Sequence, residues 1–237
     1  MSEPVKSGDV VLLHYTLVLK DENKVLETTI EEVAKEQGIY SDKATYKPTL
    51  LIIGAGEVPA GLEEAITGMN ENEEKEIEVP PEKGFGRRDP DKVRVLPARL
   101  FSSQGVIPRA GEEVEIRGER GTIVSVGSGR VIVDFNHPLA GKSLLYKVKI
   151  VKVVRNVEEK TRALLEKYIG VVEGVEVKVE GDAIILNIPF HLLHSSDFIE
   201  RIERFARDLE KHVNEVTTLK LESTMLRRMS ETPVQQT

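Results

Sequence analysis

The chain has 237 residues, of which 40% are hydrophobic and 31% charged, and its formal net charge is −7. A chain of this length can form one to three domains. Its net negative charge gives no support to a nucleic-acid partner. The sequence contains no cysteine, which excludes disulfides, a thiol nucleophile and cysteine-ligated zinc.

Targeting and membrane segments are not expected. The first residues lack the basic and apolar regions of a signal peptide. No apolar run approaches the ~20 residues that a membrane-spanning helix needs. We therefore expect a cytoplasmic protein with no membrane partner. Abundant charges of both signs are typical of a very soluble or heat-stable protein.

The first part of the chain predicts an antiparallel β unit with one short helix. Residues 8–19 alternate loosely between apolar and polar side chains, which predicts a strand, and a turn at 21–23 leads into a second strand through Leu26. Residues 30–48 are polar and irregular after a short helical start. Further elements are expected as a buried strand at 50–53, an amphipathic helix at 61–69 and a strand at 75–79.

Composition changes near Arg87, and residues 88–134 predict a small β-rich unit that can fold semi-independently. A short strand is followed by a helical turn at 97–101, with Pro97 at its start. Three more short strands, separated by glycine-bearing turns, are expected at 112–118, 122–129 and 130–135. A long β-type run at 144–154 then closes the first domain.

The remaining residues predict an α+β domain at 156–229 with the order α-β-β-α-β. The expected elements are a helix at 157–168, a hairpin of 175–179 and 183–188, a helix at 198–213 and a strand at 216–221. Asp197 with Glu200 three residues later matches a capping box, so Asp197 is the expected N-cap of the second helix. Residues 230–237 are expected to be disordered.

Three motifs occur in the order and at the spacing of one protein family. They are GEVPAGLEEAITGM at Gly56–Met69, KGFG at Lys83–Gly86 and NHPLAG at Asn136–Gly141. Together they resemble the SlyD-like branch of the FKBP-type peptidyl-prolyl cis-trans isomerases. The layout of the C-terminal part resembles the long archaeal members of that family.

This resemblance implies an α+β fold with three domains. Residues 1–87 and 135–155 would form an FKBP-like antiparallel half-barrel over a short helix. Residues 88–134 would be an inserted chaperone domain, the insert-in-flap domain of the family. Residues 156–229 would be an extra domain that serves either self-association or further client binding, two roles between which the sequence does not choose.

The resemblance also implies noncovalent catalysis of prolyl isomerisation, without a cofactor or a metal. Such catalysis needs an apolar pocket that desolvates the amide, not a nucleophile or a general base. The expected partners are unfolded or partly folded proteins and proline-containing peptides. The positions that match the family's pocket are Tyr15, Leu26, Glu27, Leu51, Val58, Pro59, Leu62, Phe85 and Tyr146.

Three of these positions depart from the family pattern. Glu27 replaces an aspartate and lengthens the side chain. Phe85 lacks the hydroxyl that the family tyrosine offers to a substrate carbonyl. Pro59 has no backbone N–H to donate to a bound carbonyl. These changes predict weaker binding of immunosuppressant-type ligands and lower activity, and they motivate the alternative of a chaperone holdase on an FKBP fold with little or no isomerase activity.

The inserted domain of the family binds extended chain segments through exposed apolar surface and an open strand edge. The candidate contact residues here are Val95, Leu96, Leu100, Phe101, Val106 and Ile107. The alternative is that they form the core of the unit, and this alternative is weaker for Phe101, which lies beside the polar SSQG run.

A metal-responsive protein is a third interpretation. His191 and His194 are three residues apart, but no cysteine or third histidine lies nearby in the sequence. The chain also ends in SETPVQQT, not in the histidine- and cysteine-rich nickel-binding tail of many bacterial SlyD-like proteins. We therefore expect no metal site.

Overall fold

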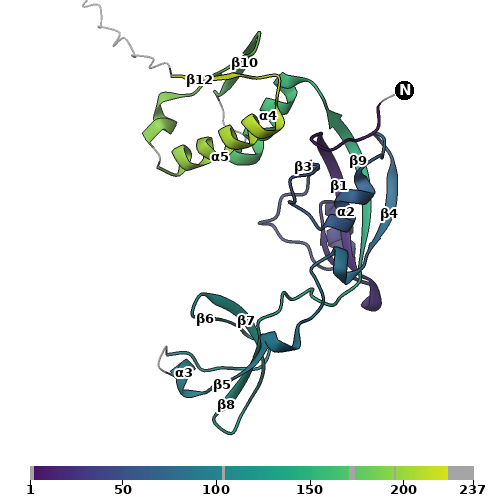
Figure 1. The fold of residues 1–237 in the computed structure, drawn as a ribbon, viewed down its shortest axis with the longest axis vertical. Coiled ribbons are helices and arrows are strands. Elements are labelled where there is room, and N and C mark those ends of the chain that lie inside the picture. The colour runs from purple at the N-terminus through teal and green to yellow at the C-terminus, as the bar shows by residue number, and fades with distance from the viewer. Residues whose placement is uncertain (1–2, 103–104, 171–173, 195, 224–237) are drawn as a thin grey trace, which may run out of the picture.

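The computed structural model describes residues 3–102, 105–170, 174–194 and 196–223, so the tail expected to be disordered lies outside the described residues. The strands form three separate sheets. Figure 1 shows the first sheet in the middle, with the inserted unit at one end and the C-terminal unit at the other. Short 3-10 turns occur at Lys20–Glu22, Pro81–Lys83, Pro90–Lys92 and Phe190–His194.

The first sheet is antiparallel, with the order β2-β1-β9-β4 and with β3 also paired to β1. β2 pairs with the second half of β1 and β3 with its first half, so both lie along the same edge of that strand. The short helices are α1 (Glu31–Glu36) and α2 (Ala60–Ile66). The strands are β1 (Val10–Leu19), β2 (Lys24–Thr28), β3 (Thr49–Ile52), β4 (Glu74–Val79) and β9 (Leu144–Val154).

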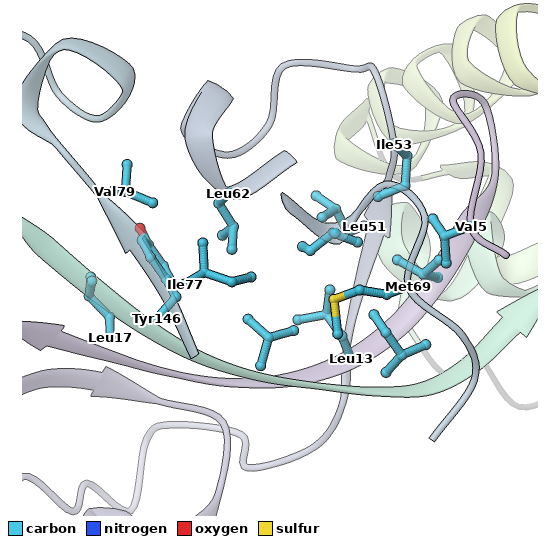
Figure 2. Close-up of a cluster of buried hydrophobic side chains, with 14 of the residues drawn as sticks. Val5, Leu13, Leu17, Leu51, Ile53, Leu62, Met69, Ile77, Val79 and Tyr146 are labelled. Carbon is cyan, nitrogen blue, oxygen red and sulfur yellow. The ribbon is translucent and has the colours of Figure 1, made fainter. Parts of the chain in front are cut away.

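Alternation along these strands divides the sheet into two apolar faces. One face packs against α2 through Leu62 and Ile66, and Figure 2 shows its side chains converging from β1, β3, β4 and β9. Each fully buried aliphatic side chain contributes roughly 1.5–3 kcal/mol to folding. The members labelled in Figure 2 are Val5, Leu13, Leu17, Leu51, Ile53, Leu62, Met69, Ile77, Val79 and Tyr146.

The inserted unit is a four-stranded antiparallel sheet in the order β5-β8-β7-β6. Its small core contains Phe101, Ile116, Ile123, Val131 and Val133. The helical turn begins at Arg99 and not at Pro97, because Pro97 ends β5 and pairs with Arg130. The elements are β5 (Val93–Pro97), α3 (Arg99–Ser102), β6 (Glu113–Ile116), β7 (Glu119–Gly127) and β8 (Arg130–Asp134).

The C-terminal unit has the α-β-β-α-β order expected from the sequence. β10 and β11 form an antiparallel hairpin, and α5 crosses over to bring β12 parallel to β11. The elements are α4 (Val157–Ile169), β10 (Glu176–Glu180), β11 (Ala183–Asn187), α5 (Ser196–His212) and β12 (Thr218–Glu222).

The capping-box prediction for α5 was wrong. The helix already includes Ser196, so Asp197 lies in its first turn instead of preceding it. The Asp197 carboxylate is 2.7 Å from the Arg201 guanidinium, one helical turn later. An i,i+4 ion pair and a favourable position near the helix N-terminus therefore explain the aspartate.

The C-terminal unit shares a hydrophobic core with the second face of the first sheet. Val10, Ile52 and Val154 of that face belong to the same buried cluster as Leu164 of α4 and Phe205 of α5. The inserted unit, in contrast, has a core of its own. The first sheet is therefore buried on both faces over part of its area.

Candidate active site

A cavity of about 580 Å³ opens at one side of the first sheet, between β1, β2, β3, α2 and β9. Leu26 does not line it and instead packs against the hydrophobic core beside it. The other eight pocket positions expected from the sequence line the cavity together: Tyr15, Glu27, Leu51, Val58, Pro59, Leu62, Phe85 and Tyr146.

Two tyrosine hydroxyls provide polarity in this apolar lining. The Tyr15 hydroxyl donates to the Glu27 carboxylate at 2.6 Å, and the Tyr15 and Tyr146 rings lie 6.2 Å apart. Burial raises the pKa of Tyr15 above its ordinary value, and the hydrogen bond to Glu27 adds to the effect. Burial, assisted by the charge of Glu27, raises the pKa of Tyr146 to about 12. Both hydroxyls therefore stay protonated at neutral pH.

The Tyr146 hydroxyl is a free donor. None of the described residues forms a hydrogen bond with it, whereas the Tyr15 hydroxyl is occupied by Glu27. Tyr146 itself is 4% exposed, so its hydroxyl reaches solvent only through the cavity. A carbonyl group bound in the cavity could accept this hydrogen bond.

The return segment after the insert forms a wall that the sequence analysis missed. The His137 ring stacks on the Phe85 ring with 4.2 Å between centroids and 1° between planes. The Nδ1 atom of His137 accepts a hydrogen bond from the backbone N–H of Leu139 at 3.1 Å, and Leu139 lines the cavity. Leu139 of the NHPLAG motif thus forms one apolar wall of the cavity, and His137 supports the wall formed by Phe85.

Leu13, Leu17 and Glu57 also line the cavity and were not predicted. Leu13 and Leu17 lie two residues before and after Tyr15 on the same strand, so the two-residue period of a strand was a signal that could have found them. Glu57 precedes the matched Val58, and nothing in the local pattern separates it from an ordinary surface carboxylate.

The rim of the cavity is a short loop held by α2. The Glu63 carboxylate accepts hydrogen bonds from the N–H groups of Gly54 at 2.8 Å and Gly56 at 3.3 Å. Both glycines have positive φ angles, +90° and +71°, which side chains rarely permit. Pro59 follows at the start of α2 and lines the cavity without a backbone donor.

A second cavity, of about 590 Å³, lies on the inserted unit. Its apolar residues are Leu96, Pro97, Leu100, Ile116 and Phe135, and we call this surface the insert groove. The charged residues that line it are Arg94, Arg99, Arg117 and Glu119. Arg94 also lies over the Phe135 ring, 4.9 Å from its centroid, and pairs with Glu119 at 2.6 Å.

The six expected chaperone contacts do not share one surface. Leu96 and Leu100 line the insert groove. Val95, Val106 and Ile107 lie outside it and are 58%, 37% and 76% exposed. The prediction for Phe101 was wrong, because this side chain is completely buried in the core of the unit. The turn of α3 directs the Phe101 ring into this core.

Within the described part of the chain, no group of three or more His, Asp or Glu side chains is arranged to hold a metal ion. The side chain of His194 lies outside what the structure describes, so its position relative to His191 is not defined. Across the described ranges, no helix has both the length and the apolar character needed to cross a membrane.

Comparison with known proteins identifies the class to which this fold and cavity belong. Residues 94–139 match the family described as FKBP26, IF domain. The chain is 40% identical over 146 residues to the short-type peptidyl-prolyl cis-trans isomerase of Methanocaldococcus jannaschii. The aligned region covers 62% of this chain and 92% of that protein. The chain therefore belongs to the FKBP-type peptidyl-prolyl cis-trans isomerases.

More distant relatives point to the SlyD-like branch. The chain is 31% identical over 129 residues to the FKBP-type isomerase SlyD of Helicobacter pylori, covering 51% of this chain and 69% of that protein. It is 28% identical over 158 residues to the FKBP-type 16 kDa isomerase of Escherichia coli, covering 65% of this chain and 96% of that protein. The SlyD-like resemblance and the fold class predicted from the sequence are thus confirmed.

Proposed function

We propose that this protein catalyses cis-trans isomerisation of prolyl peptide bonds by noncovalent binding in the cavity at the first sheet. The observation that carries the proposal is the convergence of eight matched family positions on one apolar cavity. Relatives named as peptidyl-prolyl isomerases support the same activity.

The cavity suits the chemistry of the reaction. Rotation about the prolyl bond must overcome a barrier of about 18–20 kcal/mol, because the planar amide loses its resonance. The planar amide is more polar than the twisted one, so transfer from water to an apolar site favours the twisted form. Leu51, Leu62 and Phe85 provide this environment, and either isomer can leave because no covalent bond forms.

The Tyr146 hydroxyl takes the place of donors that the cavity lacks. At the two positions where the family resemblance implies donors, Phe85 has no side-chain hydroxyl and Pro59 has no backbone N–H. Tyr146 has a protonated hydroxyl without a partner among the described residues. We assign to it the hydrogen bond that holds a substrate carbonyl during rotation.

The insert groove supplies the client-binding activity in this proposal. Residues 88–134 would act as a chaperone domain that holds an unfolded segment beside the isomerase domain of 1–87 and 135–155. Leu96, Leu100 and Phe135 offer apolar contact, and the surrounding arginines favour segments that carry carboxylates. Tethering a client in this way raises the local concentration of its prolyl bonds near the cavity.

A holdase without catalysis is the second candidate. The absence of donors at Pro59 and Phe85 favours it, since the insert groove does not depend on either residue. Short prolyl peptides distinguish the two candidates, because they reach the cavity without help from the insert. An isomerase accelerates their cis-trans isomerisation, whereas a holdase does not.

The test is isomerisation of a chromogenic prolyl tetrapeptide by the full chain and by Val58→Asp. Val58 is half-buried at the rim, so the substitution places a carboxylate where the pyrrolidine ring would bind. We expect a loss of at least about tenfold in kcat/KM, corresponding to about 1.4 kcal/mol of transition-state stabilisation. Ile199→Asp, at a 46% exposed site on α5, is the control. Equal catalysis by the wild-type protein and Val58→Asp would reject this cavity as the site.

A further inference from the structure

Strand β3 connects the isomerase cavity to the C-terminal unit. Leu51 is 3% exposed and lines the cavity. Ile52, the next residue, is completely buried in the cluster that contains Leu164 and Phe205. A four-residue strand thus has one face in the active-site wall and the other in the core of a different unit.

The rim loop is held by the same unit. The Glu57 side chain lines the cavity, and its carboxylate forms an ion pair with the Lys167 ammonium group of α4. The side chains are only 29% and 23% exposed, so water screens this pair less than most of the surface pairs. Since Glu63 of α2 binds the backbone of Gly54 and Gly56, the rim loop is fixed from two sides.

The residues around Lys167 are themselves fixed within the C-terminal unit. Lys167 lies over the Tyr168 ring, 5.2 Å from its centroid, and the Tyr168 hydroxyl donates to Asp208 of α5. At the other end of β3, Lys47 pairs with Glu166 at 2.5 Å. Lys47 lies two residues before Thr49, which lines the cavity. Consecutive residues of α4 therefore hold the segments before and after β3.

We propose that the C-terminal unit is a positioning element of the isomerase cavity, with Lys167 as the residue that holds the rim through Glu57. Lys167 does not line the cavity, so it acts through Glu57 and not on the substrate. The unit sets the width of the cavity mouth and hence the affinity for prolyl segments. This inference rests on the proposed isomerase function.

The experiment measures kcat and KM for the prolyl tetrapeptide in the full-length protein. Lys167→Met keeps the length and apolar stem of the side chain but removes its charge. We expect KM to rise about three- to tenfold while kcat changes less than about twofold, because the loosened rim weakens binding before rotation begins. Lys167→Arg keeps the positive charge, so its KM should lie within about twofold of the wild-type value. The control is Lys178→Met, at an exposed position of β10.

A double-mutant cycle and a structural readout complete the test. In a Glu57→Gln background, Lys167→Met should have almost no further effect, since the pair is already lost. The NMR methyl resonances of Leu51 and Val58 should shift in Lys167→Met but not in Lys178→Met. Unchanged KM and unchanged methyl resonances in Lys167→Met would overturn the inference even if the wild-type protein is an active isomerase. A wild-type protein without activity would instead reject the proposed function, while the methyl shifts would still report whether Lys167 holds the rim.

Discussion

The catalysis proposed for this cavity depends on few polar atoms, so the loss or gain of a single hydroxyl or N–H group should change the rate measurably. Tyr15 directs its hydroxyl to Glu27, which orients both side chains along the edge formed by β1 and β2. No described residue forms a hydrogen bond with the Tyr146 hydroxyl, which can therefore bind a substrate carbonyl. In the proposed mechanism the apolar residues desolvate the amide, and the Tyr146 hydroxyl orients its carbonyl.

Tyr146→Phe tests the role assigned to this hydroxyl. A neutral hydrogen bond contributes about 0.5–1.5 kcal/mol, so we expect kcat/KM for a prolyl tetrapeptide to fall about two- to tenfold. The ring remains, so the core that contains Tyr146 should keep its stability. Tyr40→Phe, at a 43% exposed site, is the matched control. A fully active Tyr146→Phe protein would show that another group binds the carbonyl.

Pro59→Ile tests the missing backbone donor. Pro59 has φ −52° and ψ 139°, values that isoleucine also adopts, so the new N–H can form without a change of backbone. We expect kcat/KM to rise several-fold. The unfolding free energy should fall by about 0.4–1 kcal/mol, because proline restricts the unfolded chain. Pro59→Ala restores the same N–H without the larger side chain. If neither variant is faster, the missing donor does not limit activity.

At the scale of elements, much of the fold follows from local patterns. The two-residue alternation of β1 and β9 and the glycine-bearing turns of the insert predicted those strands, because side-chain direction is a local property. The start of α5 was less predictable, since Asp197 is favourable both as a cap and within the first turn. Phe101 was misjudged because polar neighbours in sequence do not determine which way a single helical turn faces.

The candidate site could likewise be predicted only where local sequence patterns define it. The motifs located the cavity walls, whereas the contact between Glu57 and Lys167 joins residues 110 positions apart and leaves no local pattern. The burial of Val10, Ile52 and Val154 beneath the C-terminal unit is also a long-range property. Alternation in sequence indicates that a strand has an apolar face, but not which other unit covers it.

The insert groove allows a prediction for one element. Leu100→Asn places an amide among the apolar groove residues, and loss of a leucine contact costs roughly 1.5 kcal/mol. We therefore expect the dissociation constant for an unfolded client to rise about tenfold, with tetrapeptide isomerisation unchanged. Val124→Asn is the control, because Val124 is 49% exposed and lies outside the groove. Fluorescence anisotropy of a labelled unfolded protein measures its affinity for the wild-type protein and for each variant. Equal affinities of the wild-type protein and Leu100→Asn would exclude the groove as the client site.

The whole molecule combines two different kinds of junction. The C-terminal unit is fused to the first sheet through a common core, whereas the inserted unit has a separate core. Two chain segments lead to the insert, and Arg88 pairs with Asp134 across them at 2.7 Å. Nearer the cavity, the N–H of Gly141 donates to the carbonyl of Gly86 at 2.8 Å. The insert is therefore the unit that can be removed with least effect on the cavity.

The most direct test of the proposed function is the refolding of a protein whose slow step is prolyl isomerisation, which takes tens of seconds or longer without a catalyst. The full chain is compared with a variant that lacks residues 88–134 and carries a short glycine linker. We expect the full chain to accelerate refolding, the deletion to lose most of this acceleration, and both proteins to isomerise a prolyl tetrapeptide at similar rates. Suppressed aggregation without acceleration by the full chain would contradict the proposed function and indicate a holdase.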